Sequence, residues 1–139
     1  MTHQQYIFQM EIAVRDYELD SEGIVNNANY LHYLEYTRHE FCAWAGFSFG
    51  EMQRRGITPV LNKVEIEYKT PLRSGDVMLS KLWIEFKGPR FLFHQDIYNK
   101  STGALCVHAL VSCVCLENGK LSRGTVLAQA FEKYLPEQY

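Results

Sequence analysis

The sequence has no cluster of basic residues and no long hydrophobic run. Its 14 lysines and arginines stand against 16 aspartates and glutamates, which gives a formal net charge of −2. Proteins that bind nucleic acids gather their cations in a stripe or an arm, so we expect no nucleic-acid partner. The longest apolar run, residues 104–116, is interrupted by His108 and Ser112 and is too short to cross a bilayer as a helix. We therefore expect no membrane span.

Signals for metal binding, disulfides and secretion are also missing. The four cysteines form no C-x-x-C pair and no spacing typical of a zinc site. They lie in apolar segments, where cysteine usually behaves as a small hydrophobic residue. The first ten residues, MTHQQYIFQM, contain no basic stretch followed by a long apolar one, as a secretory signal does. These absences predict a reduced, cytoplasmic protein that needs no metal and no cofactor.

What the sequence does contain is enough apolar material for one compact domain spanning residues 1–139. Of its 139 residues, 47% are hydrophobic and 14% are aromatic. A chain of this length and composition can bury a substantial core. Aromatic rings also line pockets for flat or greasy ligands.

Apolar and polar residues alternate along several segments, which predicts half-buried strands. Asn118-Gly119, a strong signal for a two-residue hairpin, follows the last long strand. Turn residues separate most of the others, so the strands are expected to form an antiparallel sheet in an α+β domain. The predicted strands cover residues 6–15, 60–69, 76–86, 91–98 and 104–116.

Helical spacing predicts one long helix, from the segment NNAN at residues 26–29 to Gly46, with Asn26 or Asn27 as its N-cap. A short helix or turn is expected over 48–56, and a C-terminal helix capped by Thr125. A single long helix can cover only one face of the sheet. The strand 104–116 is apolar on both of its faces, which favours a second chain. The long helix's predicted buried face comprises Tyr30, Leu34, Thr37, Phe41 and Ala45, widened by Leu31, Tyr33, Arg38 and Trp44.

The segment DSEGIVNNANY places an acidic, glycine-containing loop directly before this helix. A helix start presents unpaired N–H groups and a partial positive charge, which suit a carbonyl oxygen that gains charge. Gly23 allows a tight turn that brings Asp20 back to the helix end. The amides of Asn27 and Ala28 would then polarise a thioester carbonyl, and Asp20 would act as nucleophile or base. Asp20 as an ordinary cap or solvated turn residue remains the alternative.

The stretch DSEGIVNNANYLHYLE resembles the signature of the hotdog-fold thioesterases, in particular the 4-hydroxybenzoyl-CoA thioesterase-like acyl-CoA thioesterases. Asp20, Gly23, Val25, Asn29 and Tyr30 all fall in register with that pattern. The likeness continues through TPVLNKVEIEYKTPLRSGD, KGPRFLFHQDIYN and TGALCVHALVSCVCLENGK, nearly the whole chain. Several bacterial members carry a histidine where this chain has an asparagine at position 27, so a substrate does not transfer by analogy.

This resemblance implies a hotdog fold, a curved antiparallel sheet wrapped around one long central helix. It implies that two such units pair edge to edge, as a homodimer or homotetramer, with acyl-CoA along the subunit interface. The family's catalytic carboxylate falls on Asp20 and its polarising amide on Asn27. Gly23, Val25 and Tyr30 are assigned to substrate binding.

Lys87 and Arg90 flank a Gly-Pro turn and are candidates for the phosphates of coenzyme A, although a solvated turn explains them equally well. Lys63 and Arg73 are weaker candidates for the same role. The predicted function is hydrolysis of a fatty or aromatic acyl-CoA to free acid and CoA. A hotdog hydratase or dehydratase, and a non-catalytic acyl-CoA-binding protein, remain alternatives.

Overall fold

The computed structural model describes residues 5–136, and their elements follow the predicted order of strand, long helix, strands and terminal helix. One-turn 3-10 helices cover Asp16–Glu18 and Glu132–Tyr134. The main elements are β1 (Phe8–Ala13), α1 (Asn27–Trp44), α2 (Phe49–Arg54), β2 (Ile57–Tyr68), β3 (Val77–Lys87), β4 (Arg90–Asn99), β5 (Leu105–Glu117), β6 (Lys120–Ser122) and α3 (Thr125–Ala130).

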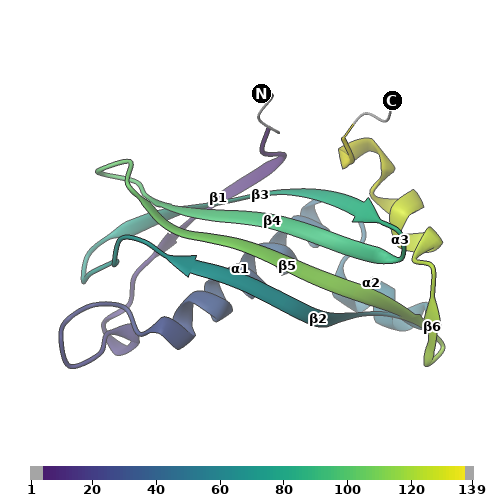
Figure 1. Ribbon diagram of the computed structural model, residues 1–139, viewed down its shortest axis with the longest axis horizontal. Helices are drawn as coiled ribbons and strands as arrows, with labels where there is room; N and C mark the ends of the chain where they lie inside the picture. The colour runs from purple at the N-terminus through teal and green to yellow at the C-terminus, as the bar shows by residue number, and fades with distance from the viewer. Residues whose placement is uncertain (1–4, 137–139) are drawn as a thin grey trace.

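The strands form one antiparallel sheet in the order β1-β3-β4-β5-β2, with the short β6 paired to β5. The sheet curls around α1, and α3 follows β6 at one end of the sheet (Figure 1). This arrangement confirms the predicted α+β class and the curved sheet around one long helix. No helix among residues 5–136 is long and apolar enough to cross a bilayer.

The core lies between α1 and the concave face of the sheet. In β3, the buried residues Met78, Ser80, Leu82 and Ile84 alternate with residues that point outward. Phe41, in the last turn of α1, is fully buried against a cluster that includes Phe131. Burying an aromatic side chain of this size stabilises the fold by about 2–3 kcal/mol. The buried phenylalanines therefore stabilise the packing of α1 against the concave face of the sheet.

The buried face of α1 is narrower than the sequence predicts. Tyr30, Leu34 and Phe41 are buried as expected. Leu31 and Trp44 are 45% and 58% exposed, so their placement on the buried face is wrong. A single sheet covers only one stripe of a helix, and these two side chains lie on its flanks.

The helix ends show one confirmed cap and one wrong one. The Asn26 side chain accepts a hydrogen bond from the Ala28 amide, which makes Asn26 the N-cap of α1. Thr125, predicted to cap α3, is instead the first residue of that helix, and the N-cap is Gly124. Gly124 has a φ of 74°, a left-handed conformation that glycine adopts without steric cost, so backbone geometry rather than a hydroxyl starts this helix.

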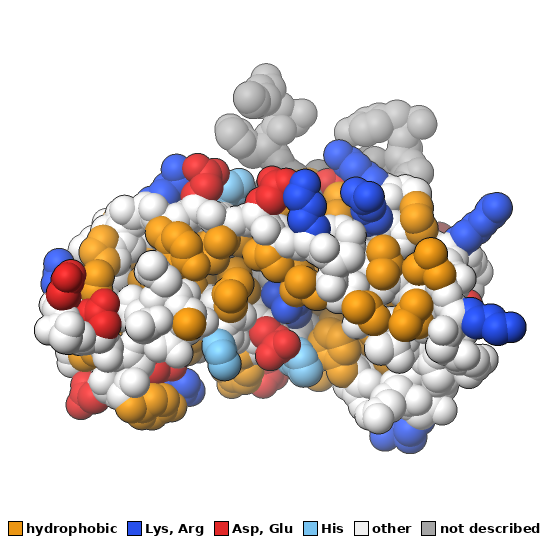
Figure 2. All heavy atoms as spheres, turned by 60° about the horizontal axis from the view of Figure 1, so that its bottom comes forward, with side chains coloured by type: hydrophobic (Ala, Val, Ile, Leu, Met, Phe, Trp, Pro, Cys, Tyr) orange, Lys and Arg blue, Asp and Glu red, His pale blue; other side chains and the backbone are white. Residues whose placement is uncertain are grey.

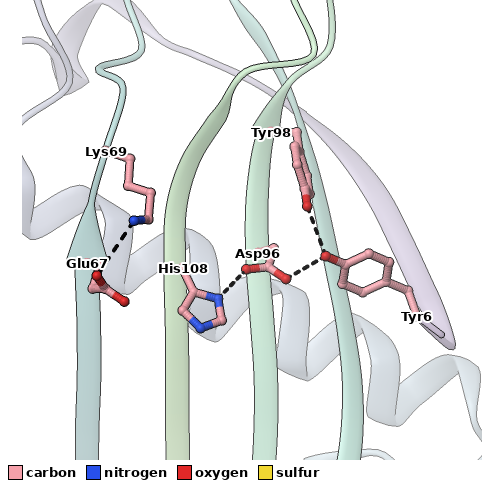
Figure 3. A network of polar contacts seen from close by, with 6 residues as sticks. All are labelled: Tyr6, Glu67, Lys69, Asp96, Tyr98 and His108. Carbon is pink, nitrogen blue, oxygen red and sulfur yellow. Dashed lines mark hydrogen bonds and ion pairs between the residues drawn. The ribbon is translucent and has the colours of Figure 1, made fainter. Parts of the chain in front are cut away.

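On the outer face of the sheet, Asp96 joins the N-terminal segment to the central strands. Asp96 is only 8% exposed. Its carboxylate accepts a hydrogen bond of 2.5 Å from the Tyr6 hydroxyl and lies 2.6 Å from Nδ1 of His108 (Figure 3). A buried carboxylate is costly unless its oxygens are paired, and these contacts supply the partners.

The edge strand β2 pairs with β5 on one side, and no strand among the described residues pairs with its other side. Its outward charges pair along the strand, Lys63 with Glu65 at 2.8 Å and Glu67 with Lys69 at 3.6 Å (Figure 3 shows the second pair). Figure 2 brings this edge forward and shows hydrophobic side chains in a band along the molecule. The exposed apolar side chains of β2 are Val60, Leu61 and Tyr68.

The turn from α2 into β2 yields a stability prediction. Gly56 has a φ of 72°, and a Cβ at this position would lie 2.2 Å from the Asn118 side-chain oxygen. Gly75 has a similar φ of 81°, but a Cβ there would meet nothing within 4 Å. Both alanine substitutions should cost about 1–2 kcal/mol for the left-handed backbone, and Gly56→Ala should cost more because Asn118 must move.

Urea unfolding of Gly56→Ala beside the control Gly75→Ala measures the difference in the free energy of unfolding. Equal losses in the two variants would show that the contact with Asn118 does not constrain this turn.

Candidate active site

The loop between β1 and α1 is closed by its own backbone. The Asp20 amide donates to the Ile24 carbonyl at 2.8 Å, and the Gly23 amide donates back to the Asp20 carbonyl at 3.0 Å. Leu19 and Val25 form an isolated β-bridge beside this turn. Gly23 has a φ of 79°, so the tight reversal predicted at this position is present and glycine suits it.

The Asp20 carboxylate is half-buried and is oriented by the same loop. Its Oδ1 accepts hydrogen bonds from the amides of Glu22 at 2.8 Å and Ile24 at 3.4 Å. These are the contacts of a turn residue, as the alternative interpretation predicts. Among residues 5–136, Oδ2 accepts no hydrogen bond, so one oxygen remains available for chemistry.

At the start of α1 the cap determines which amides are free. The Ala28 amide donates to Asn26 Oδ1 at 2.9 Å, so its predicted role as a polarising donor is revised: the cap occupies it. The Asn27 amide donates to no acceptor among the residues that the structure describes. Asn29 anchors this end, since its side-chain amide donates to the Glu18 carbonyl at 2.9 Å. Asn27 is therefore the unpaired donor at the helix start.

The Asn27 residue lines a cavity of about 210 Å³ between the start of α1 and the end of β2. Of the predicted site residues, Val25, Asn27 and Tyr30 line this cavity, whereas Asp20 and Gly23 lie outside its wall. Ile24 pairs with Asp20, and Asn27 follows Ile24 by three residues, a reach of at most about 10 Å. The carboxylate and the amide thus share one corner of the molecule.

Two residues of the cavity wall, Tyr68 and Cys106, escaped the sequence analysis. Their strands, β2 and β5, are neighbours in the sheet, and Tyr68 pairs with Val107. The Tyr68 hydroxyl donates to the Asn27 carbonyl at 3.3 Å. Burial raises the pKa of the Cys106 thiol to about 11, so this thiol is neutral near pH 7 and is a poor nucleophile. The thiol is therefore not a candidate for the nucleophile, and Asp20 remains the proposed one.

Tyr30 fixes the position of the helix start. Tyr30 is only 3% exposed, and its hydroxyl accepts a hydrogen bond of 3.1 Å from the Leu72 amide. Its ring meets those of Tyr33 and Tyr68 edge to face at 5.8 and 5.6 Å. Burial raises the pKa of Tyr30, which keeps the hydroxyl protonated. Although it lines the cavity, Tyr30 therefore also serves as an anchor.

Within one chain, Lys87 and Arg90 lie far from the start of α1. They face each other across the β3–β4 turn. Arg73, which forms a β-bridge with Ile24, precedes β3, whereas Lys87 ends it. The length of β3 puts Lys87 roughly 30 Å from the start of that strand, at the opposite end of the sheet from the start of α1 (Figure 1). Arg73 and Lys69 are the cations near the cavity.

Comparison with known proteins gives one family and consistent relatives. The profile of the thioesterase-like superfamily matches residues 14–133. A Bacillus subtilis protein with the provisional name acyl-CoA thioesterase YneP is 33% identical over 113 residues, 81% of each chain. The chloroplastic acyl-acyl carrier protein thioesterase ATL3 of Arabidopsis thaliana is 41% identical over 111 residues, which is 79% of this chain and 58% of the plant chain.

Among solved structures, a DHNA-CoA thioesterase from Staphylococcus aureus superposes with a TM-score of 0.80. The match covers 90% of this chain and 88% of that one, at 23% identity. At this identity the likeness shows the fold.

The Tyr30 anchor gives a testable prediction. Tyr30→Phe leaves the buried Leu72 amide without an acceptor, and an unpaired buried amide costs about 1–3 kcal/mol. Tyr68→Phe is the matched control, because its hydroxyl is exposed and makes a longer bond of 3.3 Å. We expect a clear drop in melting temperature for Tyr30→Phe and a small one for Tyr68→Phe. A drop of the same size in both would show that Tyr30 does not hold the helix start.

Proposed function

The chain belongs to the thioesterase-like superfamily and is a thioester hydrolase, and we propose that it cleaves a fatty or aromatic acyl-CoA to the free acid and CoA at the start of α1. The observation that carries this proposal is the Asn27 amide, which has no acceptor among the described residues and belongs to a residue that lines a cavity. An unpaired amide at a helix start stabilises a carbonyl oxygen as it gains negative charge.

The proposed chemistry divides between Asn27 and Asp20. The Asn27 N–H binds the thioester oxygen, so the carbonyl carbon becomes more electrophilic. Asp20 then either attacks this carbon and releases CoA thiolate, leaving a mixed anhydride that water cleaves, or takes a proton from a water molecule that attacks. In both routes the C–S bond breaks and the sulfur leaves as thiolate, which takes a proton to become free CoA.

A second copy of the chain is part of this proposal. The free edge of β2 and its exposed apolar side chains support edge-to-edge pairing into a homodimer or homotetramer. Antiparallel pairing of two β2 strands sets opposite ends of the two sheets side by side. The Lys87–Arg90 turn of one copy then lies at the same end as Asn27 of the other, where both cations can bind the phosphates of CoA.

Acyl carrier protein is a second candidate for the thiol that carries the acyl group. The 41% identity with the plant acyl-acyl carrier protein thioesterase favours it. The two carriers share the same thioester and the same pantetheine arm, so the chemistry at Asn27 is unchanged. They differ in what lies at the surface, a nucleotide in one case and a protein in the other.

We also propose that the enzyme works in the cytoplasm. All four cysteines are buried as free thiols, which suits a reducing compartment.

The role of Asp20 is tested by Asp20→Asn, which keeps the shape of the side chain and its acceptor oxygen for the loop amides. We expect kcat/KM for acyl-CoA to fall at least a hundredfold, or about 2.7 kcal/mol of barrier, because the amide is neither nucleophile nor base. Glu22→Gln, an exposed charge removed from the same loop, is the control and should retain activity. If Asp20→Asn hydrolyses as fast as the parent, Asp20 has no part in the reaction.

The role of Lys87 and Arg90 is tested by replacing both with alanine. For acyl-CoA we expect KM to rise about tenfold with little change in kcat, because the cations bind the nucleotide and not the reacting carbon. The same acyl group on N-acetylcysteamine, which has no phosphates, is the control substrate and should be unaffected. An unchanged KM for acyl-CoA, together with a higher kcat/KM for acyl carrier protein, would favour the second carrier.

A further inference from the structure

Arg38 is a buried cation three turns into α1. It is 8% exposed because it lies on the same side of the helix as Leu34, Thr37 and Phe41, which face the sheet. It follows Asn27 by eleven residues, or about 16 Å along the helix axis. Arg38 is therefore distant from the start of α1 and has no part in the chemistry proposed there.

Burial lowers the pKa of the Arg38 guanidinium, and the exposed Glu35 carboxylate opposes this shift without forming an ion pair. Among residues 5–136 the guanidinium forms no ion pair, and its one hydrogen bond is to Oε1 of Gln95 at 3.1 Å. Its carbon Cζ lies 5.9 Å from the centre of the Phe93 ring, a further weak stabilisation. Burial raises the pKa of the nearby Cys42 thiol to about 12, so this thiol is neutral and supplies no charge. A buried charge without a partner costs free energy that a fitting anion would recover.

Two adjoining cavities, each of about 250 Å³, share Arg38, Glu35 and Leu61 in their walls. A cavity of about 150 Å³ already admits benzene, so each has room for a ring or for a chain of several carbons. Glu35 is exposed at the mouth. The deeper walls of the first cavity are largely apolar, formed by Phe49, Met52, Phe91 and Phe93.

We propose that the Arg38 cavity binds a carboxylate that carries an apolar body. The planar guanidinium has donors beyond the one used by Gln95 and can hold both oxygens of a carboxylate. The apolar walls exclude water from the rest of the ligand, which strengthens the ion pair. Inorganic anions and nucleotides fit poorly, because they would place polar groups against phenylalanine and methionine.

An apolar carboxylate has two sources if the chain hydrolyses acyl thioesters, and this part of the inference rests on the proposed function. One is the free acid released by the reaction, which would bind as a product inhibitor. The other is the distal end of a dicarboxylic acyl chain that extends from the start of α1 to Arg38. Both present the same chemistry to Arg38.

Binding is tested by calorimetry with octanoate, with octan-1-ol as the neutral ligand of equal length. We expect octanoate to bind at least tenfold more tightly than octanol, and Arg38→Met to abolish that difference while the alcohol still binds. Where Arg38→Met does not fold, Leu31→Glu serves instead, because it sets a carboxylate in the wall of the second cavity from an exposed position on α1. Leu31→Gln is its neutral control and should bind octanoate normally.

Asp20→Asn separates this proposal from the proposed function. It should lose hydrolysis and bind octanoate as before, and octanoate binding by a protein with no hydrolase activity would still support the cavity assignment. The two sources are separated by rates. Inhibition by octanoate that Arg38→Met removes assigns the site to the product acid. A lower KM for dodecanedioyl-CoA than for dodecanoyl-CoA, lost in Arg38→Met, assigns it to the distal carboxylate.

Three results would overturn the proposal. The first is equal affinity for octanoate and octanol. The second is octanoate binding that neither Arg38→Met nor Leu31→Glu weakens. The third is the absence of octanoate binding together with dissociation of the assembly in Arg38→Met, which would show that a carboxylate of a second copy is the counterion.

Discussion

A helix enclosed by a sheet along one face must leave its two ends at the rims of that sheet, and this constraint organises the protein. The aromatic and aliphatic stripe of α1, which runs from Tyr30 to Phe41, packs along the concave face of the sheet. Its first turn therefore emerges where the loop from β1 returns, with Tyr30 fixing the end against Leu72. Asn27, whose amide has no acceptor among the described residues, lies at this rim and lines a cavity. The middle of α1 is buried in the core, so the start of the helix lies at the rim of the sheet, where a ligand can reach it.

The elements of the fold could be read from the sequence because their signals are local. Alternation marked the strands, and Asn118-Gly119 marked the hairpin between β5 and β6, where both residues have positive φ. The errors arose where a second part of the chain decides the outcome. Leu31 and Trp44 are as apolar as their buried neighbours, and only the width of the sheet's contact with α1 separates them. Thr125 has a good capping side chain, but the approach of the chain from β6 puts Gly124 in the capping position.

The candidate site divides in the same way. Val25, Asn27 and Tyr30 lie within six residues of one another, so a linear motif is enough to place them together. Tyr68 and Cys106 reach the same cavity through the pairing of β2 with β5, which no local pattern reveals. The Ala28 amide was lost to a detail of side-chain geometry, because either asparagine could cap the helix and Asn26 does so.

Lys87 and Arg90 pose a different problem, since no single chain brings them to the helix start. Their proposed role depends on a second copy, whereas that of Arg38 depends on a small molecule. The hydrolase assignment needs neither, because it rests on the family and its relatives.

The order of charges along the edge of β2 limits how two such edges can align. Lys63, Glu65, Glu67 and Lys69 read the same in both directions about Ile66. An antiparallel alignment centred there would set lysine opposite lysine and glutamate opposite glutamate, which is unfavourable. Centred instead on Val64, it would set Lys63 opposite Glu65 of the second copy, twice over by symmetry. The order of these charges thus favours one register of the two strands over another that backbone hydrogen bonding alone would allow equally well.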